Sequence, residues 1–131
     1  MKTLQGRVAL VTGGSKGVGK GIAEGLSEAG ANVYVTGRTV ANTDFDRKCI
    51  AIPCDHTRDS ETESAFARVF SESGRLDVLV NNVWAGYEQM VENGDFTWTR
   101  PFWQQSLSRW DSMFDAGVRA HFVASRLAAR Q

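Results

Sequence analysis

The chain has 131 residues, a length that suits one domain with a buried core, so residues 1–131 are predicted to form a single domain. Lysine and arginine total 15, aspartate and glutamate also total 15, and no block of like charge occurs. This balance argues against a nucleic-acid partner, because such partners need a basic patch. The N-terminal apolar run is too short for a signal peptide and no segment is apolar enough to span a membrane, so we expect a cytoplasmic protein.

The cysteines and histidines are too scattered to predict a metal site. Cys49 and Cys54 fall in one predicted strand region, at a spacing that fits neither a CxxC redox pair nor a zinc site. We therefore expect reduced, structural thiols. His56 and His121 are far apart in sequence and have no Cys/His cluster beside them, so no metal is expected.

Apolar runs alternate with segments of helical period, which is typical of a parallel sheet covered by helices on both faces. The first strand is predicted over residues 8–11 and the second over residues 32–36. Between them a glycine-rich turn leads into a helix that Gly30 ends. Its apolar positions at helical spacing are Val18, Ile22, Leu26 and Ala29.

The connection between the second and third strands is short. Residues 37–48 lack helical periodicity, so the crossover helix expected there is predicted to be missing or reduced to a turn. The third strand is predicted over residues 50–53. Thr57 then reads as the N-cap of a helix, with Asp59 and Glu61 near the positive end of its dipole.

That helix is predicted to end at Gly74 and to be followed by a fourth strand over residues 76–80, apolar throughout and hence buried on both faces. The buried stripe of the helix is predicted to be Ala65, Phe66, Val69 and Phe70.

A long segment over residues 86–107 is rich in aromatic side chains, and loops of this length are commonly functional or mobile. Its aromatic residues fit either an apolar wall over a bulky substrate or a contact with the core or another chain. They are Tyr87, Trp98, Phe102 and Trp103. Ser108 to Asp111 then matches a capping box that opens a last helix. The side chains expected along one side of it are Met113, Phe114, Gly117, Val118, His121 and Phe122.

The sequence T-G-G-S-K-G-V-G over residues 12–19 lies directly between a predicted strand and an amphipathic helix. Glycines let a pyrophosphate approach the backbone, and the amides at a helix N-terminus offer unpaired donors and partial positive charge. The pattern therefore predicts a phosphate-binding turn. The alternative is a tight turn that only packs the helix on the sheet.

The spacing T-G-x-x-x-G-x-G resembles that of the short-chain dehydrogenase/reductase family. Asn81 to Gly86 follow the fourth strand where that family carries N-N-A-G, and Asp55 follows the third strand where it carries an aspartate near the adenine. The resemblance implies an α/β fold, a Rossmann-type doubly wound parallel sheet of strand order 3-2-1-4, truncated after the fifth helix. The P-F-W segment followed by R-W-D resembles a branch of this family with an enlarged loop before that helix.

The resemblance also implies roles for individual residues. Glycines of the turn would face the phosphates, Ser15 and Val18 would donate to them, Asp55 would meet the adenine amine and Asn82 would line the ribose side. The alternatives are that Asn82 and its neighbour cap the strand and organise a turn, and that Asp55 anchors the next helix. The full set of implied cofactor-binding residues is Thr12, Gly13, Ser15, Lys16, Gly17, Val18, Gly19, Arg38, Asp55, His56, Asn81, Asn82, Val83 and Gly86.

The end of the second strand favours NADP(H) over NAD(H). NAD-selective sites usually place a carboxylate there, but Thr36 is followed by Gly37 and Arg38. A guanidinium pairs bidentately with a 2′-phosphate, and Lys16 adds a second cation on the same side. The alternative is that both are ordinary solvated surface cations.

Catalysis in this family uses a serine and a Y-x-x-x-K pair, in which lysine lowers the pKa of the tyrosine. Tyr34 and Tyr87 are the only tyrosines, and neither has a lysine four residues later. Asp115 occupies the helix position at which the family often has a supporting asparagine. We therefore expect no catalytic set in this chain.

The chain ends while still reading as helix, so we expect a truncated, dinucleotide-binding part of an NADP(H)-dependent oxidoreductase that acts on an alcohol or carbonyl in its complete form. The fourth strand would then be an exposed edge. The resemblance implies that a second copy pairs through the helix near Ser108, since this family commonly forms dimers. The alternative is a non-catalytic dinucleotide-binding or interaction module, or a non-functional truncation product.

Overall fold

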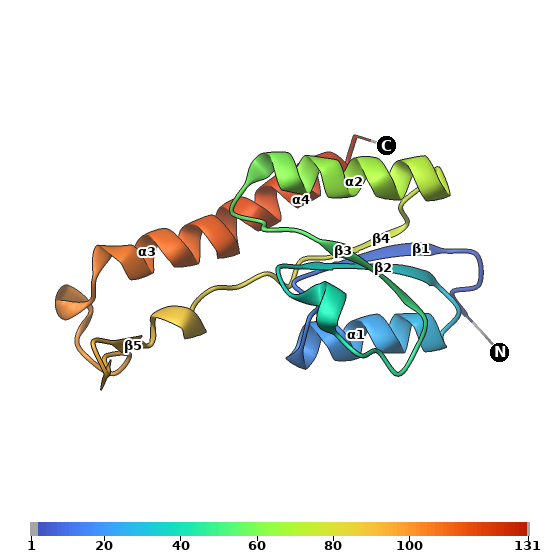
Figure 1. Cartoon of the computed structure of the whole chain (residues 1–131). Coiled ribbons are helices and arrows are strands. Elements are labelled where there is room, and N and C mark those ends of the chain that lie inside the picture. The colour runs from blue at the N-terminus through green and yellow to red at the C-terminus, as the bar shows by residue number, and fades with distance from the viewer. Residues whose placement is uncertain (1–2, 131) are drawn as a thin grey trace.

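A computed structural model describes residues 3–130 of the chain, and its core is a four-stranded parallel sheet (Figure 1). The strand order is β3-β2-β1-β4, as predicted, and the Rossmann-type doubly wound α/β class is confirmed. The strands are β1 (Val8–Thr12), β2 (Asn32–Gly37), β3 (Cys49–Pro53) and β4 (Val78–Val80).

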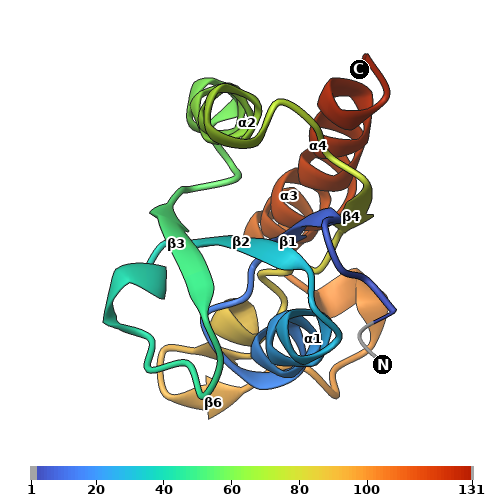
Figure 2. The ribbon, with the colours of Figure 1, turned by 90° about the vertical axis from the view of Figure 1, so that its right-hand side faces the viewer.

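Helices cover both faces of the sheet, because successive side chains of β1 and β2 point to opposite faces and all of these residues except Asn32 are buried. Helix α1 (Gly17–Glu28) lies on one face, and α2 (Asp59–Ser73) and α4 (Ala120–Ala128) lie on the other (Figure 2). On the α1 side the buried core contains Ala9, Val11, Ala23, Val33 and Val35. On the α2 side it contains Leu10, Tyr34, Phe66, Val69 and Ala124.

Helix α1 packs through small residues. Gly19 and Ala23 are its buried positions, whereas Val18, expected in the buried stripe, is 74% exposed. Val18 is the second residue of the helix and lies beside the glycine-rich turn, beyond the part of α1 that rests on the sheet. Gly30 follows the C-cap residue Ala29 with a φ of 101°, consistent with the predicted stop.

The crossover between β2 and β3 is reduced to a turn, as expected. Its only regular element is the 3-10 turn η1 (Val40–Asn42), in which Val40 is completely buried. Helix α2 has Asp59 and Glu61 in its first turn, and it ends at Gly74 with a φ of 69°, both as predicted. Ala65, Phe66 and Val69 form its buried stripe, with Phe70 half-buried beside them.

Thr57 is not the N-cap of α2, contrary to the prediction. The N-cap residue is Arg58, which makes no side-chain capping bond. The hydroxyl of Thr57 instead donates to Asp55 Oδ1 at 2.7 Å, and its backbone amide donates to the same oxygen at 2.9 Å. The Thr57 hydroxyl, which the prediction assigned to capping α2, is therefore bonded to Asp55 instead.

Strand β4 is shorter and less buried than predicted. It covers Val78–Val80 rather than residues 76–80, and its three side chains are half-buried. The strand lies at the edge of the four-stranded sheet and pairs with β1 on one side. Asp77 extends that pairing, because its amide donates to Val8 O at 2.8 Å and its Oδ2 accepts from Val8 N at 2.8 Å.

The last helical segment comprises α3 (Leu107–Met113), the π-helical turn η4 (Phe114–Arg119) and α4. Its first half extends beyond the carboxyl ends of the strands, together with the long loop (Figure 1). The helix begins after the N-cap residue Ser106, which makes no side-chain capping bond. Ser108 consequently lies inside the helix, and the predicted capping box over residues 108–111 is wrong.

The buried face of this segment also differs from the prediction. Ala116, Ala120 and Ala124 are buried, whereas Phe114, Val118 and Phe122 are 42%, 58% and 67% exposed. Alanines four residues apart form a flat face that lets α4 approach α2 closely. No helix within residues 3–130 is both long and apolar enough to cross a membrane.

Candidate nucleotide-binding site

The glycine-rich turn lies at the carboxyl end of β1 and packs against the segment that follows β4. Gly13 has a φ of 68°, a conformation that favours glycine. A Cβ on Gly13 would lie 3.0 Å from Val83 Cα and 3.2 Å from Asn82 O. The turn and the Asn-Asn segment therefore meet only because residue 13 has no side chain.

Asn82 joins these two segments. The Thr12 hydroxyl accepts from Asn82 N at 3.2 Å and donates to Val80 O at 3.3 Å. The side-chain amide of Asn82 donates to Gly13 O at 2.7 Å. The structure thus brings Thr12, Gly13 and Asn82 together, and the side-chain amide of Asn82 bonds the turn. This arrangement agrees with the interpretation that the pair organises a turn.

The N-terminus of α1 is open. Its N-cap residue Lys16 makes no side-chain capping bond, and Lys16, Gly17 and Val18 are all exposed. The turn before it is fixed from behind, because Thr43 Oγ1 donates to Ser15 O at 2.9 Å. Uncapped amides at the N-terminus of a 12-residue helix are a suitable site for a phosphate group.

Arg38 follows β2 and has a side chain that is 60% exposed. Its guanidinium pairs with the carboxylate of Glu88, which belongs to the 3-10 turn η2 (Tyr87–Gln89). Gly37, just before it, carries no side chain, and a Cβ there would displace the hydroxyl of Ser15. The first freely extending side chain after β2 is therefore a cation.

Asp55 and His56 follow β3 and differ in availability. Partial burial tends to raise the pKa of Asp55, but the hydrogen bonds from Thr57 outweigh it and hold the pKa below its usual value. The ring of His56 is 5% exposed and bonds Thr36 Oγ1 at 2.6 Å and Thr62 Oγ1 at 3.0 Å. Both ring nitrogens are thus occupied within the protein. The predicted cofactor contact of His56 stays a prediction, which the backbone of this residue rather than its ring would make.

Burial also raises the pKa of the two cysteine thiols next to this edge of the sheet. Both thiols are free, and burial raises the pKa of Cys54 to about 11 and raises the pKa of Cys49. Such thiols carry little thiolate near neutral pH and are weak nucleophiles. Within residues 3–130, no three His, Cys, Asp or Glu side chains gather as metal ligands.

The segment after β4 is bonded to α4. Asn81 Nδ2 donates to Ser125 Oγ at 2.9 Å, and His121 Nε2 lies 2.8 Å from Val83 O. Gly86 is buried against the indole of Trp84, with which any Cβ would collide. The predicted residues Asn81, Val83 and Gly86 therefore shape the backbone of this segment.

Asp115 does not face this segment. It is exposed, and its charge acts on Arg119, which bonds Asp59 of α2 at 3.2 Å. Gly117 is the residue of η4 that approaches the segment, since a Cβ there would lie 3.8 Å from the Trp84 ring. The position assigned to Asp115 stays a prediction, and the approach of Gly117 to this segment left no signal in the sequence.

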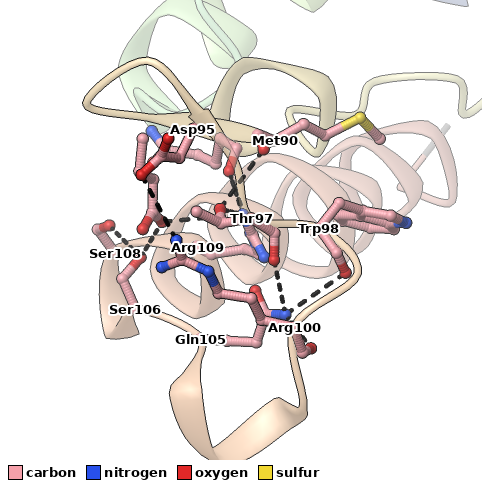
Figure 3. Close-up of polar contacts among 11 residues, drawn as sticks. Met90, Asp95, Thr97, Trp98, Arg100, Gln105, Ser106, Ser108 and Arg109 are labelled. Atoms are coloured by element: carbon pink, nitrogen blue, oxygen red, sulfur yellow. Dashed lines mark hydrogen bonds and ion pairs between the residues drawn. The ribbon is translucent and has the colours of Figure 1, made fainter.

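The long loop is an ordered unit built around Arg109 of α3 (Figure 3). It contains the antiparallel pair β5 (Val91–Glu92) and β6 (Asp95–Phe96) and the 3-10 turn η3 (Phe102–Gln104). Arg109 is 5% exposed, and it donates to Gln89 O at 3.1 Å and to Thr97 Oγ1 at 2.7 Å. Its guanidinium also lies 5.4 Å from the centre of the Trp98 ring.

The aromatic side chains of the loop do not form one wall. The Trp84 ring is edge-on to Tyr87, with centroids 4.4 Å apart, and to Trp98 at 6.4 Å. Phe102 and Trp103 form a separate edge-on pair and are 83% and 72% exposed. The first cluster, next to the Asn-Asn segment, is the one that borders the candidate site.

Comparison with known proteins agrees with this geometry. A family model described as short chain dehydrogenase matches residues 7–131. Mouse and human proteins named dehydrogenase/reductase SDR family member 1 are each 40% identical over 136 residues, which cover 97% of this chain and 42% of theirs. The chain thus spans less than half the length of these relatives.

A solved structure gives the same result for the fold. A short chain dehydrogenase from Burkholderia cenocepacia, in complex with NADP, superposes with a TM-score of 0.79 and 34% identity. The match covers 98% of this chain and 52% of that chain.

Proposed function

Because the chain belongs to the short-chain dehydrogenase/reductase family, we propose that its glycine-rich turn binds the pyrophosphate of a nicotinamide dinucleotide and that Arg38 selects NADP(H). One observation carries the proposal: the N-cap residue of α1 makes no side-chain capping bond, and a cation follows the end of β2. Backbone amides there donate to phosphate oxygens, and the helix dipole favours the negative charge.

The preference for NADP(H) rests on what the end of β2 can offer. Thr36, Gly37 and Arg38 stand at the end of β2, so the carboxylate that usually accepts from the ribose hydroxyls is absent. Arg38 supplies a planar fork that matches a phosphate, and exposed Lys16 adds positive charge at the same edge. The solved relative from Burkholderia binds NADP, which supports the same choice.

The other site residues divide into contacts and supports. We propose that Gly13, Gly17 and Gly19 leave space for the phosphates and that the amides of Ser15 and Val18 donate to them. Asp55 is proposed to lie near the adenine. The proposed supports of the site are Thr12, Asn81, Asn82, Val83 and Gly86.

The whole protein's chemistry is also a proposal, since relatives are more than twice as long. In its complete form we propose an NADP(H)-dependent oxidoreductase that acts on an alcohol or carbonyl group. Neither Tyr34 nor Tyr87 has a lysine four residues later, so these residues lack the family's proton-transfer pair. The 131-residue chain alone is proposed to bind the dinucleotide without transferring hydride.

Titration of the whole chain with NADPH and NADH, followed by nucleotide fluorescence, tests this proposal. Replacing Arg38 with alanine removes charge-assisted hydrogen bonds, so NADPH affinity is expected to fall by about ten- to a hundredfold while NADH affinity stays within about twofold. Arg47→Ala is the matched control, because that exposed arginine pairs with Glu28, away from the turn. Absence of binding to both nucleotides in a folded chain, or equal weakening of both by Arg38→Ala, would contradict the proposal.

A second copy of the chain is the proposed partner of the last helical segment. Its exposed apolar stripe consists of Leu107, Trp110, Phe114, Val118 and Phe122. Sedimentation equilibrium is expected to show a dimer that Trp110→Glu dissociates, since a charge inside an apolar interface is costly. Phe96→Glu alters an equally exposed ring off this stripe and should leave the dimer intact. A wild-type chain that sediments as a monomer at all concentrations would refute this partner.

A further inference from the structure

One ion pair crosses the candidate site from the end of β2 to the segment after β4. Arg38 and Glu88 are 50 residues apart in sequence. Arg38 Nη1 lies 3.4 Å from Glu88 Oε2, and Arg38 Nη2 bonds Oε1. Both nitrogens at the tip of the guanidinium are thus occupied by one carboxylate, in the fork-to-fork arrangement that a phosphate also uses.

A 2′-phosphate that approaches the Nη1/Nη2 fork of Arg38 competes with Glu88 for the same N–H groups. The phosphate and the carboxylate are acceptors for the same donors, and both are negatively charged, so they repel one another at contact distance. We propose that Glu88 is an internal competitor for the 2′-phosphate, so that NADP(H) displaces it from Arg38 and releases η2, whereas NAD(H) leaves the pair closed. This proposal rests on the proposed cofactor function of the same site.

The release would reach the long loop because Glu88 lies between two fixed neighbours. The Tyr87 ring contacts Trp84, and the Gln89 carbonyl accepts from buried Arg109. Movement of Glu88 away from Arg38 therefore changes the surroundings of Trp84. All four tryptophans lie between residues 84 and 110, so tryptophan emission reports this part of the molecule.

The competition should be measurable but modest. Arg38 and Glu88 are 60% and 48% exposed, and ion pairs at such positions are weak. Removing the charge of Glu88 is thus expected to tighten binding of a 2′-phosphate ligand by about two- to fivefold. A ligand without that phosphate should not sense the change.

Adenosine 2′,5′-bisphosphate and adenosine 5′-monophosphate are suitable probes, because they differ only in the 2′-phosphate. Isothermal titration of the whole chain is expected to show tighter binding of the bisphosphate to Glu88→Gln and unchanged binding of the monophosphate. Asp95→Asn is the matched control, since this carboxylate of the same loop lies 3.6 Å from Arg100 and does not contact Arg38. Thermal unfolding establishes that each variant is folded.

Tryptophan emission gives the second readout. In the wild-type chain the bisphosphate should shift the emission and the monophosphate should not, whereas Glu88→Gln should show the shifted emission before any ligand is added. Unchanged bisphosphate affinity in Glu88→Gln, in a chain that discriminates between the probes through Arg38, would overturn the role of Glu88 and leave the cofactor proposal standing. A wild-type chain that does not discriminate between the two probes would overturn both.

Discussion

Replacing Gly19 with alanine is expected to weaken dinucleotide binding by about ten- to a hundredfold and to lower the free energy of unfolding by about 1–3 kcal/mol. A Cβ at this position would lie 2.6 Å from Gly13 O and 3.0 Å from Gly14 Cα, and it would collide with Asn82 Nδ2. Two of these three atoms belong to the backbone, so the turn itself must move. The same displacement breaks the hydrogen bond from Asn82 to Gly13.

Two other glycines of α1 make matched controls. A Cβ on Gly21 or Gly25 would have no heavy atom within 4 Å. Alanine is a better helix former than glycine, so each substitution is expected to raise the free energy of unfolding by about 0.5–1 kcal/mol. Denaturant unfolding and NADPH titration of the three variants provide the comparison. If Gly19→Ala behaves like Gly21→Ala in both measurements, the turn does not depend on close packing at residue 19.

The sequence predicted those parts of the fold that depend on local pattern. Strands β1 and β2 are buried on both faces and therefore appear as continuous apolar runs. Gly74 ends α2 because its left-handed conformation is one that other residues rarely adopt. The glycine-rich turn was found for the same reason, since its spacing and its place between a strand and a helix are both local.

Packing partners were harder to predict. In the last helical segment, Ala116 and Ala124 lie on one face and Phe114 and Phe122 on another, and both faces have helical period. Periodicity favours the larger side chains, but α2 accommodates the smaller ones. Nothing local distinguishes the two choices, because the decision depends on how closely α4 approaches α2.

Side-chain pairs between distant segments left no signal at all. Glu88 pairs with Arg38, and Arg109 contacts Gln89, each through bonds that join segments 20 or more residues apart. His56 bonds Thr36 and Thr62 through its ring, and neither partner is near it in a local sequence pattern. A buried arginine in a polar loop is the kind of residue that sequence alone treats as solvated surface.

Acidification is expected to remove about 3 kcal/mol of stability through His56 alone. Burial lowers the pKa of His56 from 6.5 to about 4 in the folded chain. Between these two values the unfolded chain binds a proton that the folded chain does not. The contribution is therefore complete above pH 6.5, is lost progressively as the pH falls, and is constant again below about pH 4.

Urea unfolding of the wild-type chain and of His56→Gln from pH 7 to pH 4 measures this effect. Glutamine has no proton to gain, so the variant should lack the decline in this window, although the lost bonds lower its stability equally at every pH. Asp77 contributes in a lower range, because hydrogen bonds from Arg75 and Val8 bring its pKa to about 2. Its stabilisation is lost only as the pH falls below 3.8, so the two effects separate.

The position of His56 makes this a test of the site as well as of stability. Its partner Thr36 lies in β2, two residues before Arg38. Its other partner, Thr62, lies near the start of α2. A neutral ring that bonds both Thr36 and Thr62 joins the end of β2 to α2 and has no ring nitrogen left for a nucleotide. Parallel pH profiles for the wild-type chain and His56→Gln would mean that the ring is hydrated and titrates normally, and a contact with the adenine side would again be open to it.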